Sequence, residues 1–382
     1  MHKLESFATS CGSKINKPFI DYAFYPIVDE KFICISQDSP YQAKSYDLFD
    51  DVIFHIKPYL DKNNISIIQI GKKESGDLFY TKNYKNLSFK QNSYIVNKSI
   101  LYLGNLNVYS HLASSIGKTI ICPSNHDYLE TSKPYWINNE SLIALPGIDH
   151  KPFFSETETP KTINKINPEI LACHILDTLN IKHDLNLIET LHIGADYTNK
   201  SIDIVPFNCN SQTINVDPNI YPNIRLDKNF TPSFLTSFYK YKNIVITTDK
   251  EIKLDFLYPI KNSIKCFNFI VDSNTSEDSV LNLSKLGKPI YLFTKEEDSL
   301  PEIRLKFFDF TVMSIKEYSK SSLSIDFIND SIKFLSKKNI LSEKGVFNSY
   351  YSLDVNSNSS SVTDSQLFWD DLNHYRIYKI NS

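Results

Sequence analysis

Polar side chains that could hold an anion stand at the starts of two predicted helices, each of which follows an apolar run in the first half of the chain. Lys44 follows the first run, and Asn107, Ser110 and His111 follow the second. A helix that begins after a strand offers unpaired N–H groups and a favourable dipole to an anion, and a lysine there adds a point charge for a diphosphate. The types and spacing of these residues predict a phosphate or ribose site. The alternative is that they are ordinary caps and surface residues.

Carboxylates follow other apolar runs. Glu74 stands after ISIIQIG, where it could accept hydrogen bonds from ribose hydroxyls, although Lys72 and Lys73 beside it are equally typical of a charged loop. In the second half, Asp196 and Asp249 each follow a predicted strand, where either could take a proton from an acceptor hydroxyl. Such positions are also common for turn or capping residues.

One loop, residues 123–136, carries a His-Asp pair and an aromatic Pro-Tyr-Trp cluster. His126 and Asp127 are adjacent, so their side chains diverge, and no third ligand follows at the spacing that a metal site needs. We therefore expect no bound metal. Tyr135 and Trp136 are expected to pack the loop down, while sugars and bases also stack on such rings.

The elements that must position these residues form a β–loop–α series. Uninterrupted apolar strands predict a parallel sheet covered by helices on both faces, with ligands bound beyond the carboxyl ends of the strands. Pro58 should end or kink the helix that contains it. The strands are predicted at 32–36, 65–71, 100–104 and 118–122, and the helices at about 45–57, 89–98, 107–116 and 167–179.

A second β/α series begins at Ile188, so the fold class predicted is α/β with two Rossmann-like domains. This arrangement suggests the GT-B architecture, in which a nucleotide sugar sits in a cleft. The C-terminal segment QLFWDDLNHYRIY is too apolar for a free tail and is expected to dock on this chain or on a partner. Three parts are predicted: a nucleotide-sugar-binding domain at 1–180, a second Rossmann-like domain at 187–350 that could hold the acceptor, and a Ser/Asn-rich linker with the docking segment at 351–382. The second-half strands are predicted at 188–194, 202–208, 243–249, 264–271, 289–293 and 310–315.

Composition excludes several function classes. The chain has 382 residues, is 41% hydrophobic and has a formal charge of −3, so neither wholesale disorder nor a general nucleic-acid binder is expected. It has 9 glycines and lacks both the dinucleotide fingerprint and the P-loop. The 6 cysteines are spread singly, with no C-x-x-C pair, as expected of free thiols in a reducing compartment. Neither a leader nor a membrane-spanning run is evident, so the sequence predicts a cytoplasmic protein.

Residues 1 to about 180 resemble the donor-binding domain of heptosyltransferase-like glycosyltransferases (family 9). The likeness rests on FICIS with its following loop, IIQIGKKES, LSFKQNSYIVNKSILYLGN and GNLNVYSHLASSIGKTIIC. The resemblance implies that Lys44 meets the donor pyrophosphate and that Glu74 meets the nucleoside. Ser110, His111 and Ala113 fit the helix start at which members of the family have the motif Asp-Ser/Thr-Gly-x-x-His-x-Ala.

This chain departs from the family at that helix start. It has Leu106, Asn107 and Val108 where the family has an aspartate, a Ser/Thr and a small residue. The domain order is also unusual, because in the family an acceptor-binding domain comes first and supplies the catalytic base. The resemblance covers less than half of the chain.

The function expected is therefore transfer of a sugar from a nucleotide-diphosphate sugar to a saccharide or other acceptor, with no metal and no cofactor besides the donor. Donor binding is assigned to Lys44, Glu74, Asn107, Ser110 and His111. Asp196 is the candidate base. The alternative is a degenerate, non-catalytic relative that acts as a structural or carbohydrate-binding protein, which the substituted helix start and the missing catalytic motif favour. Epimerase chemistry on nucleotide sugars is a third possibility with less support.

Overall fold

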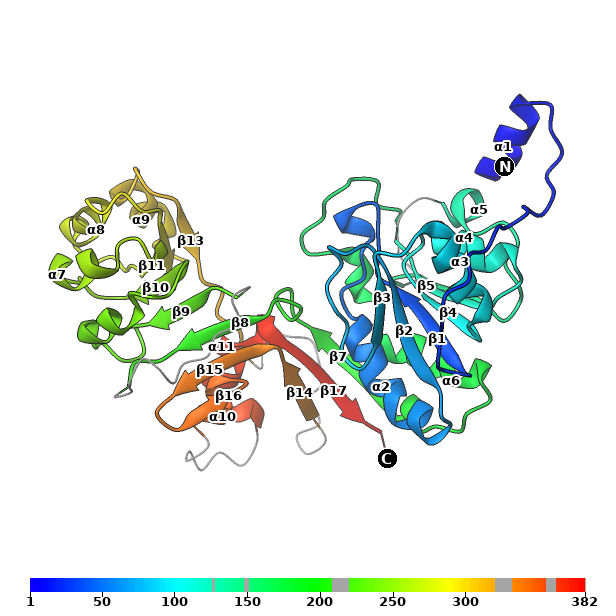
Figure 1. Cartoon of the computed structure of the whole chain (residues 1–382). Helices are drawn as coiled ribbons and strands as arrows, with labels where there is room; N and C mark the ends of the chain where they lie inside the picture. The colour runs from blue at the N-terminus through cyan, green and yellow to red at the C-terminus, as the bar shows by residue number, and fades with distance from the viewer. Residues whose placement is uncertain (126–127, 148–150, 208–219, 320–331, 355–361, 382) are drawn as a thin grey trace. The chain divides into compact units, whose positions relative to one another are not determined.

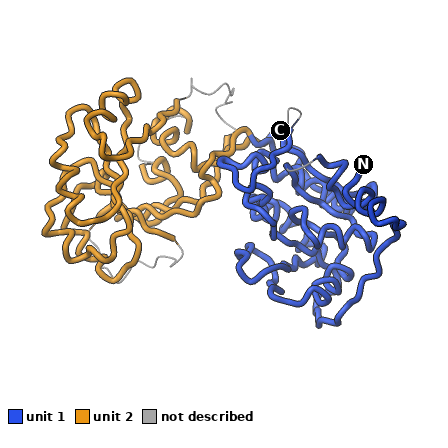
Figure 2. The backbone as a smooth tube through the Cα atoms, turned by 90° about the horizontal axis from the view of Figure 1, so that it is seen from above, with its two compact units in different colours: residues 1–190, 380–382 blue, residues 191–379 orange. Residues whose placement is uncertain are grey.

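The protein forms two compact units in a computed structural model of the chain. Unit 1 comprises residues 1–190 and 380–382, and unit 2 comprises residues 191–379 (Figure 2). The structure describes residues 1–125, 128–147, 151–207, 220–319, 332–354 and 362–381. Each unit is built on its own sheet, as expected for two separate hydrophobic cores.

Unit 1 is built on a parallel six-stranded sheet in the order β3-β2-β1-β4-β5-β6 (Figure 1). This is the strand order of the Rossmann fold, in which the direction of chain progression reverses between the first and fourth strands. The carboxyl ends of β1 and β4 therefore flank the crevice where such sheets bind ligands. The strands are β1 (Phe32–Ser36), β2 (Ser66–Gly71), β3 (Lys82–Lys85), β4 (Leu101–Gly104), β5 (Ile120–Pro123) and β6 (Leu142–Ala144).

Helices cover both faces of this sheet. Helices α3 and α4 contact each other, and so do α2 and α6. Phe32 and Cys34 of β1 face the α3–α4 layer, while Ile33 and Ile35 between them are also fully buried, as expected of a strand covered on both faces. The helices are α1 (Lys3–Ser10), α2 (Phe49–Lys62), α3 (Phe89–Lys98), α4 (Val108–Ser115), α5 (Leu129–Ser132) and α6 (Pro168–Thr178), with short 3-10 turns η1 (Gln42–Lys44), η2 (Thr162–Lys165) and η3 (Leu185–Leu187).

The helix predicted at 45–57 was wrong at both ends. It begins at Phe49, because the backbone N–H groups of Tyr46 and Asp47 donate to side chains of other loops, at 3.1 and 3.0 Å. It continues past Pro58 to Lys62. The proline lies on the exposed side, where the carbonyl it leaves unpaired can meet water, and the buried Leu60 holds the last turn against the core.

Gly104 lets β1 and β4 approach closely at the point where the sheet order reverses. Its φ is +157°, and a Cβ there would lie 2.2 Å from the carbonyl oxygen of Ser36. We expect Gly104→Ala to lower the free energy of unfolding of unit 1 by more than about 2 kcal/mol, because both the conformation and the contact are lost. Urea unfolding followed by circular dichroism measures this loss.

Gly117→Ala is the matched control for that prediction. Gly117 also has a positive φ, +80°, but a Cβ there would meet no atom within 4 Å. It should therefore cost only the conformational penalty, about 1 kcal/mol. Equal losses for the two variants would show that the approach of β4 to Ser36 is not the cause.

Unit 2 contains an eight-stranded sheet in the order β13-β12-β11-β10-β9-β8-β15-β16, parallel except for the edge strand β16. The chain builds outward from β8 to β13 and later returns to the other side of β8 as β15. The strands are β8 (Ser201–Ile204), β9 (Pro222–Arg225), β10 (Ile244–Thr248), β11 (Ile264–Ile270), β12 (Ile290–Thr294), β13 (Val312–Ser314), β15 (Lys338–Ser342) and β16 (Gly345–Phe347).

The helices of unit 2 are short. Helix α8 begins after Ser276 and has Glu277 and Asp278 in its first turn. They are α7 (Leu254–Leu257), α8 (Glu277–Ser284), α9 (Leu300–Lys306), α10 (Tyr350–Leu353) and α11 (Gln366–Asp370), with 3-10 turns η5 (Pro232–Phe238), η6 (Tyr258–Ile260), η8 (Val362–Asp364) and η9 (Leu372–His374).

A separate three-stranded sheet, in the order β14-β17-β7, contains the end of the chain. The strands are β7 (Ile188–Ile193), β14 (Ile332–Ser336) and β17 (Tyr375–Ile380), and β17 pairs antiparallel with β14 (Figure 1). The strand predicted at 188–194 exists but does not start the large sheet. The C-terminal aromatic segment packs on this chain, with Phe368, Trp369, Leu372, Tyr375 and Ile377 buried in one cluster.

The predicted fold class is confirmed: both units are α/β structures built on mainly parallel sheets. Within the described ranges, no helix has the length and apolar character required to cross a bilayer.

Candidate functional site

A cavity of about 560 Å³ lies beyond the carboxyl ends of β4 and β5 in unit 1. This volume suits a small-molecule ligand. Lys44 and His111, which the sequence singled out separately, both line it. The other lining residues are His2, Lys3, Leu4, Leu106, Pro123, Ser124, Asn125, Thr131, Ser132, Tyr135, Trp136 and Ile163.

Lys44 ends the 3-10 turn η1, and hydrogen bonds to the segment 156–158 hold this turn in place. The N–H of Ala43 donates to the carbonyl of Glu156 at 3.0 Å, and the Gln42 side chain exchanges two hydrogen bonds with the backbone of Glu158, at 2.8 and 3.0 Å. The Lys44 ammonium lies 5.2 Å from the centre of the Tyr41 ring. The loop therefore presents a cation to the cavity from a fixed backbone.

His111 enters the cavity from the first turn of α4, and its side chain is accessible. Desolvation by the surrounding protein, and to a lesser extent the neighbouring His2, lowers the pKa of His111. A neutral imidazole offers one N–H donor and one acceptor to a ligand. His111 can thus take part in hydrogen bonding in the cavity while Lys44 supplies the charge.

Asn107 and Ser110 hold the start of α4 in place. The Asn107 Oδ1 accepts from the N–H groups of Tyr109 and Ser110 and from the hydroxyl of Tyr102, and its Nδ2 donates to the carbonyl of Asp38 at 2.9 Å. The buried Ser110 hydroxyl donates to the Asn107 carbonyl and accepts from its N–H, at 2.7 and 3.0 Å. Their polar atoms are occupied by these bonds and neither residue lines the cavity, so they fix the start of the helix that carries His111.

Residues near the N-terminus form another part of the cavity wall. The Nε2 of His2 donates to the carbonyl of Lys133 at 2.8 Å, its Nδ1 accepts from the N–H of Leu4, and its ring meets Tyr135 edge to face. Sequence reasoning missed this contribution. The available signal was the spacing of His2 and Glu5, which form a capping box at the start of α1.

The lining is basic. Four lining side chains, His2, Lys3, Lys44 and His111, are cationic or can be protonated, whereas no Asp or Glu of the described residues lines the cavity. Asn125 adds a buried amide, whose Nδ2 donates to Glu158 at 3.2 Å and whose Oδ1 has no partner in the described part of the chain. This combination favours an anionic ligand.

Glu74 does not line this cavity. It is exposed in the loop after β2, and its neighbours Lys72 and Ser75 line a smaller hollow of about 380 Å³ beyond the ends of β1 and β2. Asp38 fixes that loop, since its carboxylate accepts from the Lys72 N–H at 3.0 Å and from the Ser75 hydroxyl. The Asp38 carboxylate packs against Gly71, and a Cβ at position 71 would lie 2.7 Å from it, which is why this position is glycine.

The remaining candidates lie elsewhere. Asp196 occupies a turn after β7, where its N–H donates to the carbonyl of Asn373 at 2.8 Å and its carboxylate accepts from Asn199 at 3.2 Å. Asp249 is exposed after β10. His126 and Asp127 lie outside the described residues, and within those residues no three His, Cys, Asp or Glu side chains gather as a metal site would require.

Sequence comparisons identify no relative, since no protein-family model and no curated protein matches the chain. Solved structures do resemble part of it. One is the dodecameric iron-containing heptosyltransferase TibC of enterotoxigenic E. coli in complex with ADP-D-beta-D-heptose, at 14% identity over 41% of this chain and 47% of that chain, with a TM-score of 0.33.

Two further structures are similar to a comparable extent. A family 9 glycosyl transferase from Veillonella parvula is 12% identical over 46% of this chain and 50% of its own, with a TM-score of 0.33. The E. coli heptosyltransferase WaaC with ADP is 12% identical over 46% and 54%, with a TM-score of 0.32. This chain spans about half of the length of each. Part of the chain is thus similar to heptosyltransferases and family 9 glycosyltransferases, the partial resemblance noted in the sequence.

Proposed function

We propose that unit 1 binds a nucleotide-diphosphate sugar in the cavity lined by Lys44 and His111. The observation that carries this proposal is the meeting of these two residues, from the turn η1 and the helix α4, in one basic cavity at the ligand-binding edge of a Rossmann-ordered sheet. Lys44 would neutralise the diphosphate, and the rings of Tyr135 and Trp136 would pack against a base or sugar. The hollow beside Glu74 would receive a further part of the ligand.

We further propose that the protein transfers the sugar to a saccharide or other acceptor. In that step the acceptor oxygen attacks the anomeric carbon, the bond from that carbon to the diphosphate breaks, and the diphosphate leaves with the bonding electrons. A carboxylate takes the hydroxyl proton, for which Asp196 stays our candidate. Lys44 would stabilise the negative charge of the leaving diphosphate.

Leu106 favours a second candidate function, that of a non-catalytic nucleotide-sugar or carbohydrate-binding protein. It lines the cavity at the position where the family resemblance implies an aspartate, and no carboxylate of the described residues replaces it there. The two functions differ in turnover. A catalytic protein releases nucleoside diphosphate from the donor in the presence of acceptor, whereas a binding protein returns the donor intact.

Replacing Lys44 by alanine tests the donor site. We expect one class of nucleoside diphosphate and its sugar conjugates to raise the melting temperature of the wild-type protein by mass action. Loss of a charge-assisted contact in Lys44→Ala should weaken binding by about 10- to 100-fold, as expected for about 1.5–3 kcal/mol. Thermal unfolding with a panel of nucleotides and nucleotide sugars gives the measurement.

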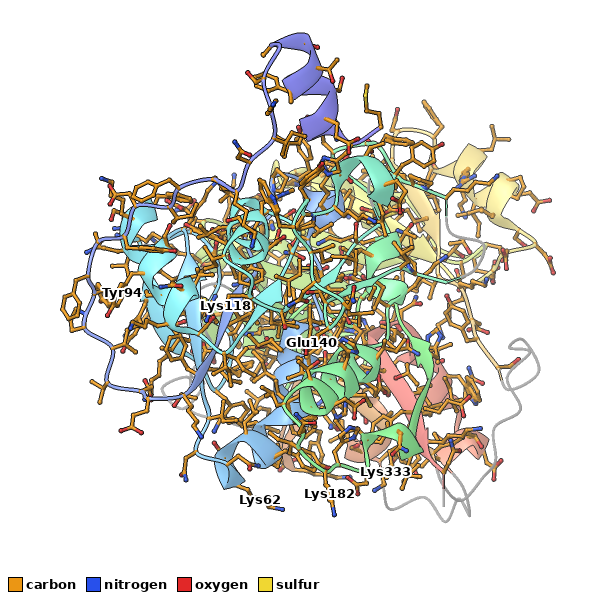
Figure 3. All side chains as sticks on the ribbon, turned by 90° about the vertical axis from the view of Figure 1, so that its right-hand side faces the viewer. Lys62, Tyr94, Lys118, Glu140, Lys182 and Lys333 are labelled. Atoms are coloured by element: carbon orange, nitrogen blue, oxygen red, sulfur yellow. The ribbon has the colours of Figure 1, made fainter. Side chains whose placement is uncertain are left out.

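Lys62→Ala is the control for this experiment. Lys62 ends α2 and lies with Lys182 at the end of unit 1 opposite to α1 (Figure 3). Its removal changes the net charge equally and should leave nucleotide binding unchanged. A response that is absent across the whole panel, or that is equal in the Lys44 and Lys62 variants, would contradict the proposed donor site.

A further inference from the structure

Unit 2 has its own reversal of strand order, and a cavity lies there. The sheet grows from β8 through β9 in one direction, and β15 pairs on the opposite side of β8. A crevice outside the carboxyl ends of the strands at such a reversal is the usual ligand position in open α/β sheets. The unit 2 cavity, of about 570 Å³, is lined by Val205, Pro206, Phe207, Lys228, Asn229, Thr231, Ser342, Glu343, Lys344, Tyr350, Leu353, Asp354 and Leu367.

The lining comes from the end of β15 and the segments that follow β8, β9 and β15, together with α10 and α11, and hydrogen bonds connect these parts. The side chain of Asn229, after β9, donates to the carbonyl of Pro206, after β8, at 2.7 Å. Tyr350 forms part of the wall, and its hydroxyl donates to the buried Asp203 at the end of β8 at 2.8 Å. The cavity is therefore built on fixed elements.

Three cations surround the Tyr350 ring, and two of them are neutralised. Arg225, Lys338 and Lys228 lie 5.4, 4.9 and 5.0 Å from the ring centre. Arg225 and Lys338 each pair with Asp203 and with a second carboxylate. Lys228 has no carboxylate within 4 Å among the described residues, and it lines the cavity.

The electrostatic environment of Lys228 favours an added anion. Desolvation, and then the nearby Arg225, lower the pKa of Lys228 against the opposing effect of Asp227 and Asp370. Lys344, on the turn between β15 and β16, supplies a second ammonium to the same cavity. Two point charges of this kind suit a phosphate group.

The rest of the lining suits hydroxyl groups and an apolar face. Glu343 and Asp354 are acceptors that would repel a wholly anionic ligand but would bind hydroxyl donors. Phe207, Leu353 and Leu367 offer apolar surface. We propose that unit 2 binds a phosphorylated, hydroxyl-bearing small molecule in the unit 2 cavity, with the phosphate held by Lys228 and Lys344. This site lies entirely within unit 2 and does not depend on the proposed nucleotide site.

Labelling of lysines with pyridoxal 5′-phosphate, followed by borohydride reduction and peptide mass mapping, tests the proposal on the full chain. The reagent carries a phosphate and reacts with unprotonated amines. Lys228 should be modified at least about fivefold faster than the exposed Lys62, and glucose 6-phosphate should protect it while glucose should not. Modification of Lys228 at the Lys62 rate without protection would overturn the proposal.

Two variants complete the test. Lys228→Met and Lys344→Met should each abolish the broadening of the phosphorus NMR signal of glucose 6-phosphate by the protein, whereas Lys44→Ala should retain it. Broadening that survives in both unit 2 variants and disappears in Lys44→Ala would place phosphate binding in unit 1 alone and refute the unit 2 site. Loss of nucleotide binding in Lys44→Ala with retained glucose 6-phosphate binding would separate the two proposals.

Discussion

Replacing Asp203 by asparagine should lower the free energy of unfolding of unit 2 by about 3 kcal/mol or more. Removing the Asp203 charge breaks two buried ion pairs at once and leaves Arg225 and Lys338 with one carboxylate partner each, and breaking a buried pair in this way costs more than the pair itself contributes. Asp203 is 3% exposed, and its carboxylate meets Arg225 at 2.9 Å and Lys338 at 3.1 Å. Asparagine keeps the shape but not the charge.

The size of the loss reflects how far the network extends. Lys338 also pairs with Asp371 at 2.9 Å, and the second oxygen of Asp371 accepts from the N–H of Tyr350 at 3.1 Å. Through these bonds Asp203 connects β8, β15 and the C-terminal segment. Loss of its charge should therefore loosen elements that are distant in the sequence.

Urea unfolding of unit 2, with local stability assigned by hydrogen exchange and mass spectrometry, measures the effect. Asp309→Asn, a change at an exposed carboxylate, is the control and should alter stability by less than about 0.5 kcal/mol. Adding Lys338→Met to Asp203→Asn should deepen the loss, since the buried Asp371 then loses the ammonium with which it pairs. A loss below about 1 kcal/mol for Asp203→Asn would contradict the role assigned to this network.

The pH dependence supplies an independent check. The ion pairs lower the pKa of Asp203 from 3.8 to about 2 against the opposing effect of desolvation. A carboxyl with a lowered folded pKa stabilises the protein above pH 3.8, and this contribution, about 2 kcal/mol, is lost as the pH falls toward 2. The stability difference between wild type and Asp203→Asn should therefore shrink in that window.

The histidines contribute at higher pH, where the contribution of His192 should be the same in wild type and Asp203→Asn, whereas that of His374 also depends on the Asp203 charge. Burial lowers the pKa of His192 and His374. Their neutral forms are favoured in the folded state, so stability should begin to fall once the pH drops below the ordinary histidine pKa of 6.5. The two windows separate the histidines from Asp203.

Local patterns in the sequence predict most of the parallel strands, although β3, β6, β9 and β15 were missed. The apolar run at Phe32–Ser36 is β1, and the helix predicted at 89–98 is α3, which Ser88 caps. Both signals act between neighbouring residues, so they need no knowledge of the rest of the chain. The helix start at Asn107 and the position of His111 in its first turn were predictable for the same reason.

Strand pairings and side-chain contacts between residues that are far apart in the sequence were not predictable. Strand β17 pairs with β14, and the Tyr350 hydroxyl bonds Asp203 from 147 positions away. In the sequence, Lys338 and Asp203 are indistinguishable from surface charges, since only tertiary packing buries them. His2 was missed as a cavity residue because its place depends on a bond to Lys133, 131 positions away.

The C-terminal aromatic segment should contribute strongly to the stability of unit 2, and Phe368→Ala tests this. Phe368 is fully buried, and its ring lies 5.5 Å from that of Phe334, 5.2 Å from that of Trp369 and 5.2 Å from that of Tyr375. Truncation removes apolar burial and leaves a cavity among rings that β14 and β17 hold apart. We expect a loss of about 3–5 kcal/mol in the free energy of unfolding.

Two controls separate packing from a general effect of losing a phenylalanine. Phe308→Ala, at a side chain that is 78% exposed, should change stability by less than about 0.5 kcal/mol, while Phe368→Leu should retain much of the burial and lose less than Phe368→Ala. Hydrogen exchange should rise in Phe368→Ala through β14 and β17 as well as in α11, because the cluster joins them. If exchange rises only in α11 and the loss stays below about 1 kcal/mol, the segment is a surface attachment, and the stability of unit 2 resides in its parallel sheet alone.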